Sequence, residues 1–437
     1  MGELSKDNLL RSWKEIAAYL GVDIRTCCRW ENERGLPVHR AEDGEKKSPV
    51  FAYKNELDAW FKHAFKSTRH LEELRRTRRL LRWIVGVPSL VVLSGILLYL
   101  LALRTPRQPA DFEIQGSVFV ALDEHKRELW RRDTRVEDLQ TEGYYRSNFQ
   151  VIHTDQVNIL PLLVMKDIDG DGGTEVLLAV KRLRDQTGEG YLYCFDRRGK
   201  KRWEFKAGEG LVCGGYRFAP DFRIAGLLAR DVNGDGRAEI FVEAFNSPSW
   251  PCLLITLDSS GEKTGEFVNA GYLREIAFHD INGDGREELL AAGVNNEYRG
   301  GCLAVFDPLD IRGGSPQTGE FKCEKLEPGS MLYYVTLPFC DVSRAQGHII
   351  DGLRTLEITG GDWIRAETSN GIYYDFDFNL KCFQVGFGHA FMMDHYEMWR
   401  AGAVTSLLDD AYKAELIKGV RYWDGSAWAS APTPVKR

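Results

Sequence analysis

Three short acidic loops in the middle of the chain constrain its fold more than any other sequence feature. They read DIDGDGGTE, DVNGDGRAE and DINGDGREE from residues 167, 231 and 280, and each leads into an apolar stretch. Oxygen ligands at loop positions 1, 3, 5 and 9, with a backbone carbonyl at position 7, can encircle a hard cation, and glycines at positions 4 and 6 permit the tight curl. The pattern therefore predicts calcium loops inside β-hairpins. The predicted ligands are Asp167, Asp169, Asp171 and Glu175; Asp231, Asn233, Asp235 and Glu239; and Asp280, Asn282, Asp284 and Glu288.

Two alternatives compete with this interpretation of the loops. An EF-hand begins in the same way, but its bidentate Glu at position 12 is replaced here by Leu178, Val242 and Ala291, and strands rather than helices are expected to follow. A metal-free hairpin closed by Asx turns is the second alternative. It leaves several carboxylates close together without a cation, where they repel one another.

A second element repeats out of phase with the acidic loops. Apolar strands that end in Asp are expected at 119–123, 193–196, 255–258, 304–307 and 374–377, and several continue through a Gly into another strand. One unit is then a calcium hairpin, a strand, an Asp turn and a strand, and successive loops begin 64 and 49 residues apart. Four short strands per unit indicate a β-propeller blade, which gives about seven blades over residues 111–437.

The repeated D-x-[DN]-G-D-G-x-x-E motif resembles the FG-GAP or VCBS repeats of integrin α-subunit propellers and bacterial surface proteins. The resemblance implies structural calcium in all three loops. It also implies an unknown protein or glycan as the ligand of the propeller. No fourth loop of this pattern follows Pro308.

A run of 21 uncharged, mostly apolar residues, 83–103, lies between Arg82 and Arg104. Its length matches the roughly 20 residues that a helix needs to cross a bilayer, so a single transmembrane helix is predicted, in preference to a core helix or a cleaved signal peptide. Positive charge stays on the cytoplasmic side, which predicts a cytoplasmic N-terminus and an extracytoplasmic C-terminal part. The charges concerned are Arg75, Arg76, Arg78, Arg79 and Arg82.

Net charge divides at the same place. The first 82 residues hold 18 Lys and Arg against 13 Asp and Glu, whereas the remainder holds 39 against 51. The N-terminal part therefore suits a polyanion and the C-terminal part suits cations or neutral ligands.

The N-terminal segment carries helix start and stop signals. Ser12 and Glu15 form a capping box that opens one helix, and Gly21 ends it; Asp23 then caps a second helix that runs to Arg34. Strands near 38–41 and 49–53 flank a basic turn, and a third helix begins near residue 54. Two short helices joined by a Gly-containing turn are typical of a helix-turn-helix.

Residues 12–61, SWKEIAAYLGVDIRTCCRWENERGLPVHR followed by VFAYKNELDAWF, resemble the winged helix-turn-helix of the excisionase and MerR-like DNA-binding families. The resemblance implies that six residues contact DNA bases or phosphates: Arg25, Thr26, Arg29, Arg40, Lys46 and Lys47. The alternative is a helix-turn-helix used for protein contacts, because several acidic residues dilute the positive field.

The cysteines and histidines indicate no catalytic group. Seven of the nine cysteines follow the apolar run, and their number and spacing are compatible with a few disulfides or with buried thiols. His389, Asp394 and His395 lie among aromatic residues, where packing roles are more common than chemistry. We therefore do not expect an enzyme.

These observations predict a multidomain chain: a small α+β winged helix-turn-helix domain (1–66), a basic juxtamembrane helix (67–82), a transmembrane α-helix (83–103), a linker (104–110) and an all-β propeller (111–437). The function that follows is a membrane-anchored one-component transcription regulator with an extracytoplasmic calcium-binding sensor. An imperfect heptad pattern over 57–81 allows a homodimer. The alternative is a cell-surface adhesion or interaction protein whose N-terminal domain is a scaffold.

Overall fold

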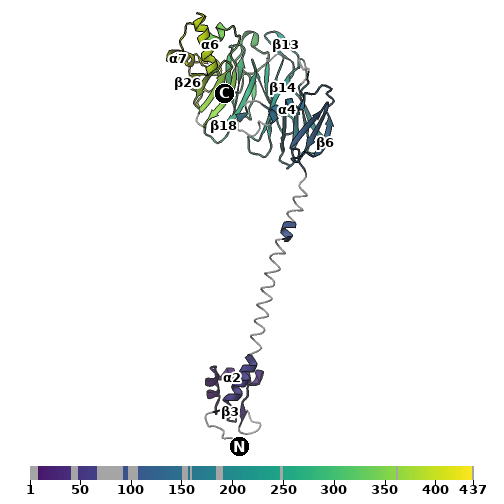
Figure 1. The fold of residues 1–437 in the computed structure, drawn as a ribbon, viewed down its shortest axis with the longest axis vertical. Coiled ribbons are helices and arrows are strands. Elements are labelled where there is room, and N and C mark those ends of the chain that lie inside the picture. The colour runs from purple at the N-terminus through teal and green to yellow at the C-terminus, as the bar shows by residue number, and fades with distance from the viewer. Residues whose placement is uncertain are drawn as a thin grey trace. The chain divides into compact units, whose positions relative to one another are not determined.

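The computed structural model describes residues 8–40, 48–65, 92–96, 107–149, 156–157, 160–183, 190–246, 250–360 and 363–435. The chain divides into two compact units, Met1–Pro106 and Arg107–Arg437, which are described separately below (Figure 1).

The first unit has two capped helices and a small sheet. Helix α1 (Trp13–Leu20) begins at Ser12, whose hydroxyl accepts the Glu15 amide, and α2 (Ile24–Arg34) begins at Asp23, whose carboxylate accepts the Thr26 amide. Gly21 and Gly35 end these helices with positive φ. Strands β1 (Leu9–Leu10), β3 (Val50–Tyr53) and β2 (His39–Arg40) form an antiparallel sheet in that order, and residues 54–65 are helical.

A small apolar core holds the first unit together. Ile16 of α1, Cys27 of α2, Ala52 of β3 and Leu57 are fully buried. The Trp60 indole donates a 2.8 Å hydrogen bond to the Arg34 carbonyl at the end of α2. The predicted helices and hairpin strands are confirmed, since their caps and turns are encoded locally. That they form a DNA-binding winged helix-turn-helix stays a prediction.

The predicted transmembrane helix is corrected by the structure. Within the described part of the chain, no helix is long and apolar enough to cross a membrane. Of the predicted span, only residues 92–96 are described, as a helix of little more than one turn against the roughly 20 residues required. The rest of that span and the predicted juxtamembrane helix lie outside the described residues. The described residues therefore contradict the predicted single-pass membrane localisation.

The second unit consists mainly of antiparallel sheets. The first three are β4 (Asp111–Gln115), β5 (Val118–Leu122) and β6 (Glu128–Asp133); β8 (Leu163–Lys166), β9 (Glu175–Ala179), β10 (Tyr191–Phe195) and β11 (Lys201–Lys206); and β14 (Arg223–Arg230), β15 (Glu239–Phe245), β16 (Cys252–Leu257) and β17 (Lys263–Asn269), with β21 (Arg312–Gly314) added in parallel.

Two further sheets follow. One holds β18 (Leu273–His279), β19 (Glu288–Asn295), β20 (Gly300–Phe306) and β22 (Tyr333–Thr336), extended by β7 (Gln156–Val157), β27 (Arg421–Trp423) and β28 (Trp428–Ala429). The other holds β23 (Leu353–Thr359), β24 (Trp363–Thr368), β25 (Ile372–Phe376) and β26 (Cys382–Phe387). Strands β12 (Leu211–Cys213) and β13 (Tyr216–Phe218) form a ribbon.

Helices are few in this unit. They are α4 (Glu142–Phe149), α5 (Asp341–Ala345), α6 (His389–Arg400), α7 (Asp410–Gly419) and the 3₁₀ turn η3 (Gly319–Phe321). Helices α6 and α7 lie beside β26 (Figure 1).

The predicted propeller of about seven blades, whose count and closure the sequence leaves open, is corrected by the structure. The described strands of this unit form five sheets of three or more strands instead of seven, and no closed sheet occurs among them. The short-range part of the prediction is confirmed, because β5, β10, β16, β20 and β25 each end at the expected Asp turn. The Asp196 carboxylate, for example, accepts the amides of Arg198 and Lys200 at 2.9 and 2.8 Å.

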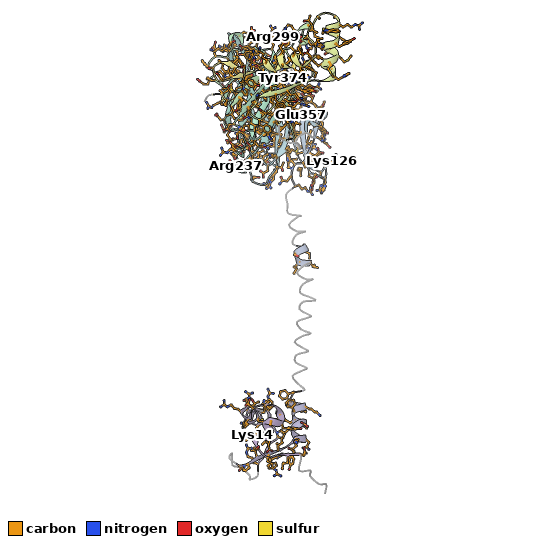
Figure 2. The ribbon with its side chains drawn as sticks, turned by 90° about the vertical axis from the view of Figure 1, so that its left-hand side faces the viewer. Lys14, Lys126, Arg237, Arg299, Glu357 and Tyr374 are labelled. Carbon is orange, nitrogen blue, oxygen red and sulfur yellow. A yellow bond between two sulfur atoms is a disulfide. The ribbon has the colours of Figure 1, made fainter. Side chains whose placement is uncertain are left out.

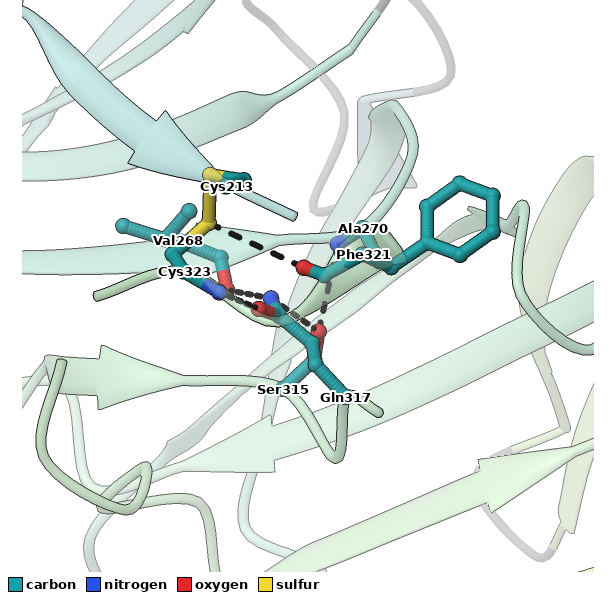
Figure 3. The surroundings of a disulfide bond; sticks show 7 residues. All are labelled: Cys213, Val268, Ala270, Ser315, Gln317, Phe321 and Cys323. Carbon is teal, nitrogen blue, oxygen red and sulfur yellow. Dashed lines mark hydrogen bonds between the residues drawn. A yellow bond between two sulfur atoms is a disulfide. The ribbon is translucent and has the colours of Figure 1, made fainter. Parts of the chain in front are cut away.

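One disulfide crosses the second unit. Cys213, at the end of β12, is bonded to Cys323, which lies 110 residues further along the chain. The Cys323 amide donates to the Gln317 side chain at 3.2 Å, and Gln317 in turn donates to the Ser315 hydroxyl at 3.1 Å (Figure 3). The other five cysteines of this unit are buried thiols, so both possibilities left open by the sequence occur together.

Candidate metal centre

Each acidic loop joins the first two strands of a sheet, at the same position in the register. The last cross-strand pairs before the loops are Lys166 with Glu175, Arg230 with Glu239, and His279 with Glu288. The Glu at loop position 9 is thus the first residue of the second strand. Its carboxylate accepts the amide of position 2, at 3.2, 3.1 and 3.0 Å in the three loops.

The first Asp of each loop organises the turn. The Asp167 carboxylate accepts the amides of Gly170 and Gly172, both at 2.8 Å, and Asp231 and Asp280 repeat these bonds in their own loops. The glycines at positions 4 and 6 have φ between 75° and 85°, where a side chain would strain the backbone. The Asp and the glycines together hold the remaining oxygens in place.

The loops lie along one edge of the second unit. A Cβ atom on Gly170 of the first loop would lie 2.8 Å from the Gly236 carbonyl oxygen of the second. Arg230, just before the second loop, lies 2.5 Å from a carboxylate oxygen of Glu287 in the third. Figure 2 shows Arg237, in the second loop, at the opposite edge of this unit from Arg299, in the turn after β19.

The first loop brings its oxygens close together. Ligand atoms of Asp167, Asp169 and Glu175 lie within 4.8 Å of one another, so this cluster has the composition and spacing to hold a metal ion. However, Arg202 Nη1 lies 2.6 Å from Asp169 Oδ2 and 3.2 Å from Glu175 Oε1. Burial raises the pKa of Glu175 to about 7, a backbone hydrogen bond and Arg202 oppose that rise, and the charge of Asp169 adds to it.

A β-bulge directs Arg202 toward the loop. In the register of β10 with β11, Cys194 pairs with Trp203 and Phe195 pairs with Lys201, which leaves Arg202 as the extra residue. A bulge of this kind re-aims a side chain. The sequence prediction missed Arg202, although it is the only Arg at that place among the hairpins that follow the three loops.

Among the residues that the structure describes, no such cation contacts the ligand carboxylates of the second and third loops. The residue at the matching bulge of the next sheet is Thr264, and β20 pairs with β22 without a bulge. Here an Asn amide takes the place of the guanidinium. Asn233 Nδ2 lies 3.0 Å from Glu239 Oε1, and Asn282 Nδ2 lies 2.5 Å from Glu288 Oε1. The acidic side chains of these two loops therefore offer oxygen ligands, which calcium prefers, without a guanidinium bound to them in the way that Arg202 is bound in the first loop.

The residues predicted to contact DNA are only partly placed. Arg25 and Arg29 are exposed on α2, while the Thr26 hydroxyl donates to the Asp23 carboxylate at 2.8 Å. Arg40 is turned inward and pairs with Glu31 of α2, with Nη1 2.6 Å from Oε1. Lys46 and Lys47 lie outside the described residues.

The histidine group near the C-terminus has a structural role. His395 is buried on α6, and its Nε2 lies 3.0 Å from the Ser406 carbonyl oxygen. The Ser406 hydroxyl donates to Asp341 of α5 at 2.6 Å. These contacts tie α6 to α5, and Asp394 is not part of them.

Comparison with known proteins supports the repeat and little else. Solved structures with some likeness include a rhamnogalacturonan lyase of Bacillus licheniformis, with 16% identity, a TM-score of 0.30, and coverage of 50% of this chain and 41% of that one. The V. cholerae biofilm matrix protein Bap1 is 15% identical with a TM-score of 0.26, and the match covers 53% of this chain and 40% of Bap1. The Dos1 propeller is 11% identical with a TM-score of 0.28, and the match covers 62% of this chain and 65% of that one. The chain thus spans less than two thirds of the length of each, and at these TM-scores none carries an argument about fold or activity.

The prediction that the chain is not an enzyme accordingly stays a prediction. The comparison with curated proteins gave no match. Among family models, the one described as FG-GAP-like repeat matches residues 167–242, which span the first two acidic loops and most of β15. The resemblance inferred from the motif is confirmed for this segment, since residues 167–242 match the FG-GAP-like repeat.

Proposed function

We propose that the second unit is a calcium-stabilised interaction module that acts outside the cell, as an adhesion or matrix protein does. The observation that carries the proposal is the thrice-repeated turn in which one Asp and two positive-φ glycines fix a set of oxygen ligands along one edge. Such loops need free calcium, which is abundant outside cells and scarce in the cytosol.

The disulfide supports the same compartment. Disulfides persist in oxidising, extracellular surroundings and are rare in cytosolic proteins. The first unit then serves as a scaffold, in keeping with the pairing of Arg40 with Glu31 instead of an outward projection.

The metal part of the proposal is tested by melting the full chain in calcium, in magnesium and in EGTA. We expect a higher melting temperature in calcium than in EGTA, because an ion that binds only the folded state stabilises it. Magnesium should have little effect, because it demands stricter octahedral geometry. Equal melting temperatures in calcium and EGTA would refute the metal.

The interaction part is tested by incubating labelled full chain with cell-surface and biofilm-matrix preparations. Retention that calcium promotes and EGTA reverses is the expected result. Absence of retention in both buffers would contradict an adhesion role even if calcium raises the melting temperature.

A further inference from the structure

A cavity of about 640 Å³ lies at the ends of the strands that are remote from the acidic loops. Its walls come from the start of β14, β18 and β23 and from the end of β15, whereas the loops follow the other ends of β14 and β18. Residues near α4 and β8 complete it. The lining residues used below are Tyr144, Lys181, Glu243, Phe245, Tyr272, Arg274, Glu275, Arg354 and Thr355.

A β-bulge at the start of one strand in each of three sheets places one residue of that sheet in the cavity wall. In β14, β18 and β23 the register shifts near the first residues of the strand, and the extra residues are Ala225, Arg274 and Arg354. All three line the cavity. Since a bulge re-aims a side chain, the repeat positions one variable side chain per sheet around a common space. Two of the three are arginines.

Two nearly buried carboxyl groups line this space, and one oxygen of each is buried without a hydrogen-bond partner among the described residues. Glu243 and Glu275 are 2% and 6% exposed, and Glu243 Oε1 and Glu275 Oε2 have no hydrogen-bond partner among the described residues. A buried polar atom without a partner costs about 1 to 3 kcal/mol, which a ligand group that donates a hydrogen bond recovers. Burial raises the pKa of each carboxyl to about 8, and the charge of Arg274 opposes the rise. Near neutral pH these groups therefore both donate and accept.

The surroundings disfavour a bare cation. Arg274 and Arg354 are exposed beside the carboxyls, and Lys181 also lines the cavity, so positive charge surrounds the two acids. The Arg274 guanidinium lies over the Tyr272 ring at 4.8 Å, which fixes it next to an aromatic face. Tyr144 and Phe245 add further rings.

A polyhydroxylated ring fits all of these groups. Each of its hydroxyls can donate to a carboxyl oxygen and accept from a guanidinium at the same time, and its C–H faces pack on aromatic side chains. The cavity volume lies within the roughly 300 to 1,000 Å³ of small-molecule sites.

We propose that this cavity binds a saccharide, with Glu243 and Glu275 bonding ring hydroxyls and Arg274 and Arg354 holding the ligand at the opening. The proposal rests on the function proposed above and gives the interaction module a ligand class. It does not depend on the acidic loops, which lie at the other ends of the strands.

The test uses the full chain in calcium and calorimetric titration with a panel of tetrasaccharides, some built of neutral hexoses and some of hexuronates. Glycine and magnesium chloride serve as the zwitterionic and cationic probes. We expect at least one tetrasaccharide to bind, and Glu243→Leu, Glu275→Leu and Arg354→Ala each to weaken it by about tenfold or more, because each removes the polar group that bonds the sugar. A preference for hexuronates would show that the arginines bind a carboxylate, and a preference for neutral sugars that they bind hydroxyls; both support the proposal.

Glu357→Gln is the matched control, because Glu357 is exposed on the same strand as Arg354 (Figure 2). It should bind like the parent chain. Arg354→Ala changes an exposed side chain, so it keeps the test valid if a buried Leu variant fails to fold. The proposal would be overturned if no saccharide binds, if glycine or magnesium chloride alone displaces the saccharide, or if all three variants bind it as the parent chain does. Melting the same samples in EGTA reports on the calcium loops separately.

Discussion

The first acidic loop, with four acidic ligands, and the second, with three and Asn233 in place of the fourth, differ in how they balance their charge. Both have the same Asp and glycine hydrogen bonds, and both end on a Glu that accepts an amide from inside the loop. In the first, Arg202 contacts Asp169 and Glu175, whereas in the second the matching bulge holds the uncharged Thr264. The motif thus specifies the turn, and a residue outside the motif decides whether the protein itself supplies a cation.

This difference suggests that the loops depend on calcium to unequal extents. A guanidinium within 2.6 and 3.2 Å of two ligand carboxylates occupies the space of an ion and neutralises part of the charge. The second and third loops have only an Asn amide in that place. We infer that they account for most of the response to calcium.

The largest effect is expected from removing charge in the second and third loops together. Asp235→Asn with Asp284→Asn retains the oxygens that accept the amides of Arg237 and Arg286, so the turns should persist while calcium affinity falls. Two saturated sites contribute about 5 kcal/mol when calcium exceeds Kd a hundredfold. Most of the calcium-dependent rise in melting temperature, on the order of 10 °C, should disappear.

Differential scanning calorimetry in calcium and in EGTA measures this loss. Glu262→Gln, an exposed carboxylate in the neighbouring Asp turn, is the control and should retain the full rise. A double variant that also retains the full rise would place the calcium response elsewhere.

An intermediate effect is expected from Arg202→Ala. Without calcium the variant should lose about 1 to 3 kcal/mol of stability, because the nearly buried Glu175 is left without its charged partner. Calcium should restore the loss, and the number of bound ions should rise by one. Chemical denaturation in EGTA and in calcium, with a calcium titration, measures both quantities.

Arg198→Ala removes an exposed arginine from the same turn and is the matched control. If Arg202→Ala and Arg198→Ala respond alike to calcium, Arg202 does not replace an ion in the first loop.

The smallest effect is expected from placing an arginine beside the second loop, at the position that corresponds to Arg202. Thr264→Arg places a guanidinium at the bulge that corresponds to Arg202 and should weaken calcium binding by the second loop several-fold, a change on the order of 1 kcal/mol. Thr264→Gln offers similar length without charge. Equal calcium affinities for the two variants would show that this bulge does not reach the loop.

Sequence reasoning succeeded wherever the determinants are close together in the chain. The turn of each acidic loop is fixed by hydrogen bonds within nine residues, and the caps at Ser12 and Asp23 lie within three residues of the amides that they bind. That these loops bind calcium stays a prediction. It failed where pairing is remote. Strand β27 pairs with β22 although Tyr422 lies 87 residues after its partner Val335, and a period counted along the chain does not reveal this or whether the sheets close.

The candidate sites show the same limit. The three loops were predicted residue by residue, but Arg202 and the cavity arginines come from bulges in strands that the motif does not include. A bulge depends on the register between two strands, which the sequence of either strand alone does not fix.

The disulfide between Cys213 and Cys323 has a consequence for the resistance of the protein to proteolysis. The 110-residue stretch that it closes includes all of β14–β20, and with them the second and third loops. A single cut in an exposed turn of this stretch leaves both fragments covalently joined and held by their strand pairing. A nicked chain should therefore migrate as one species on a non-reducing gel and as two after reduction, and before reduction its acidic loops should still be assembled.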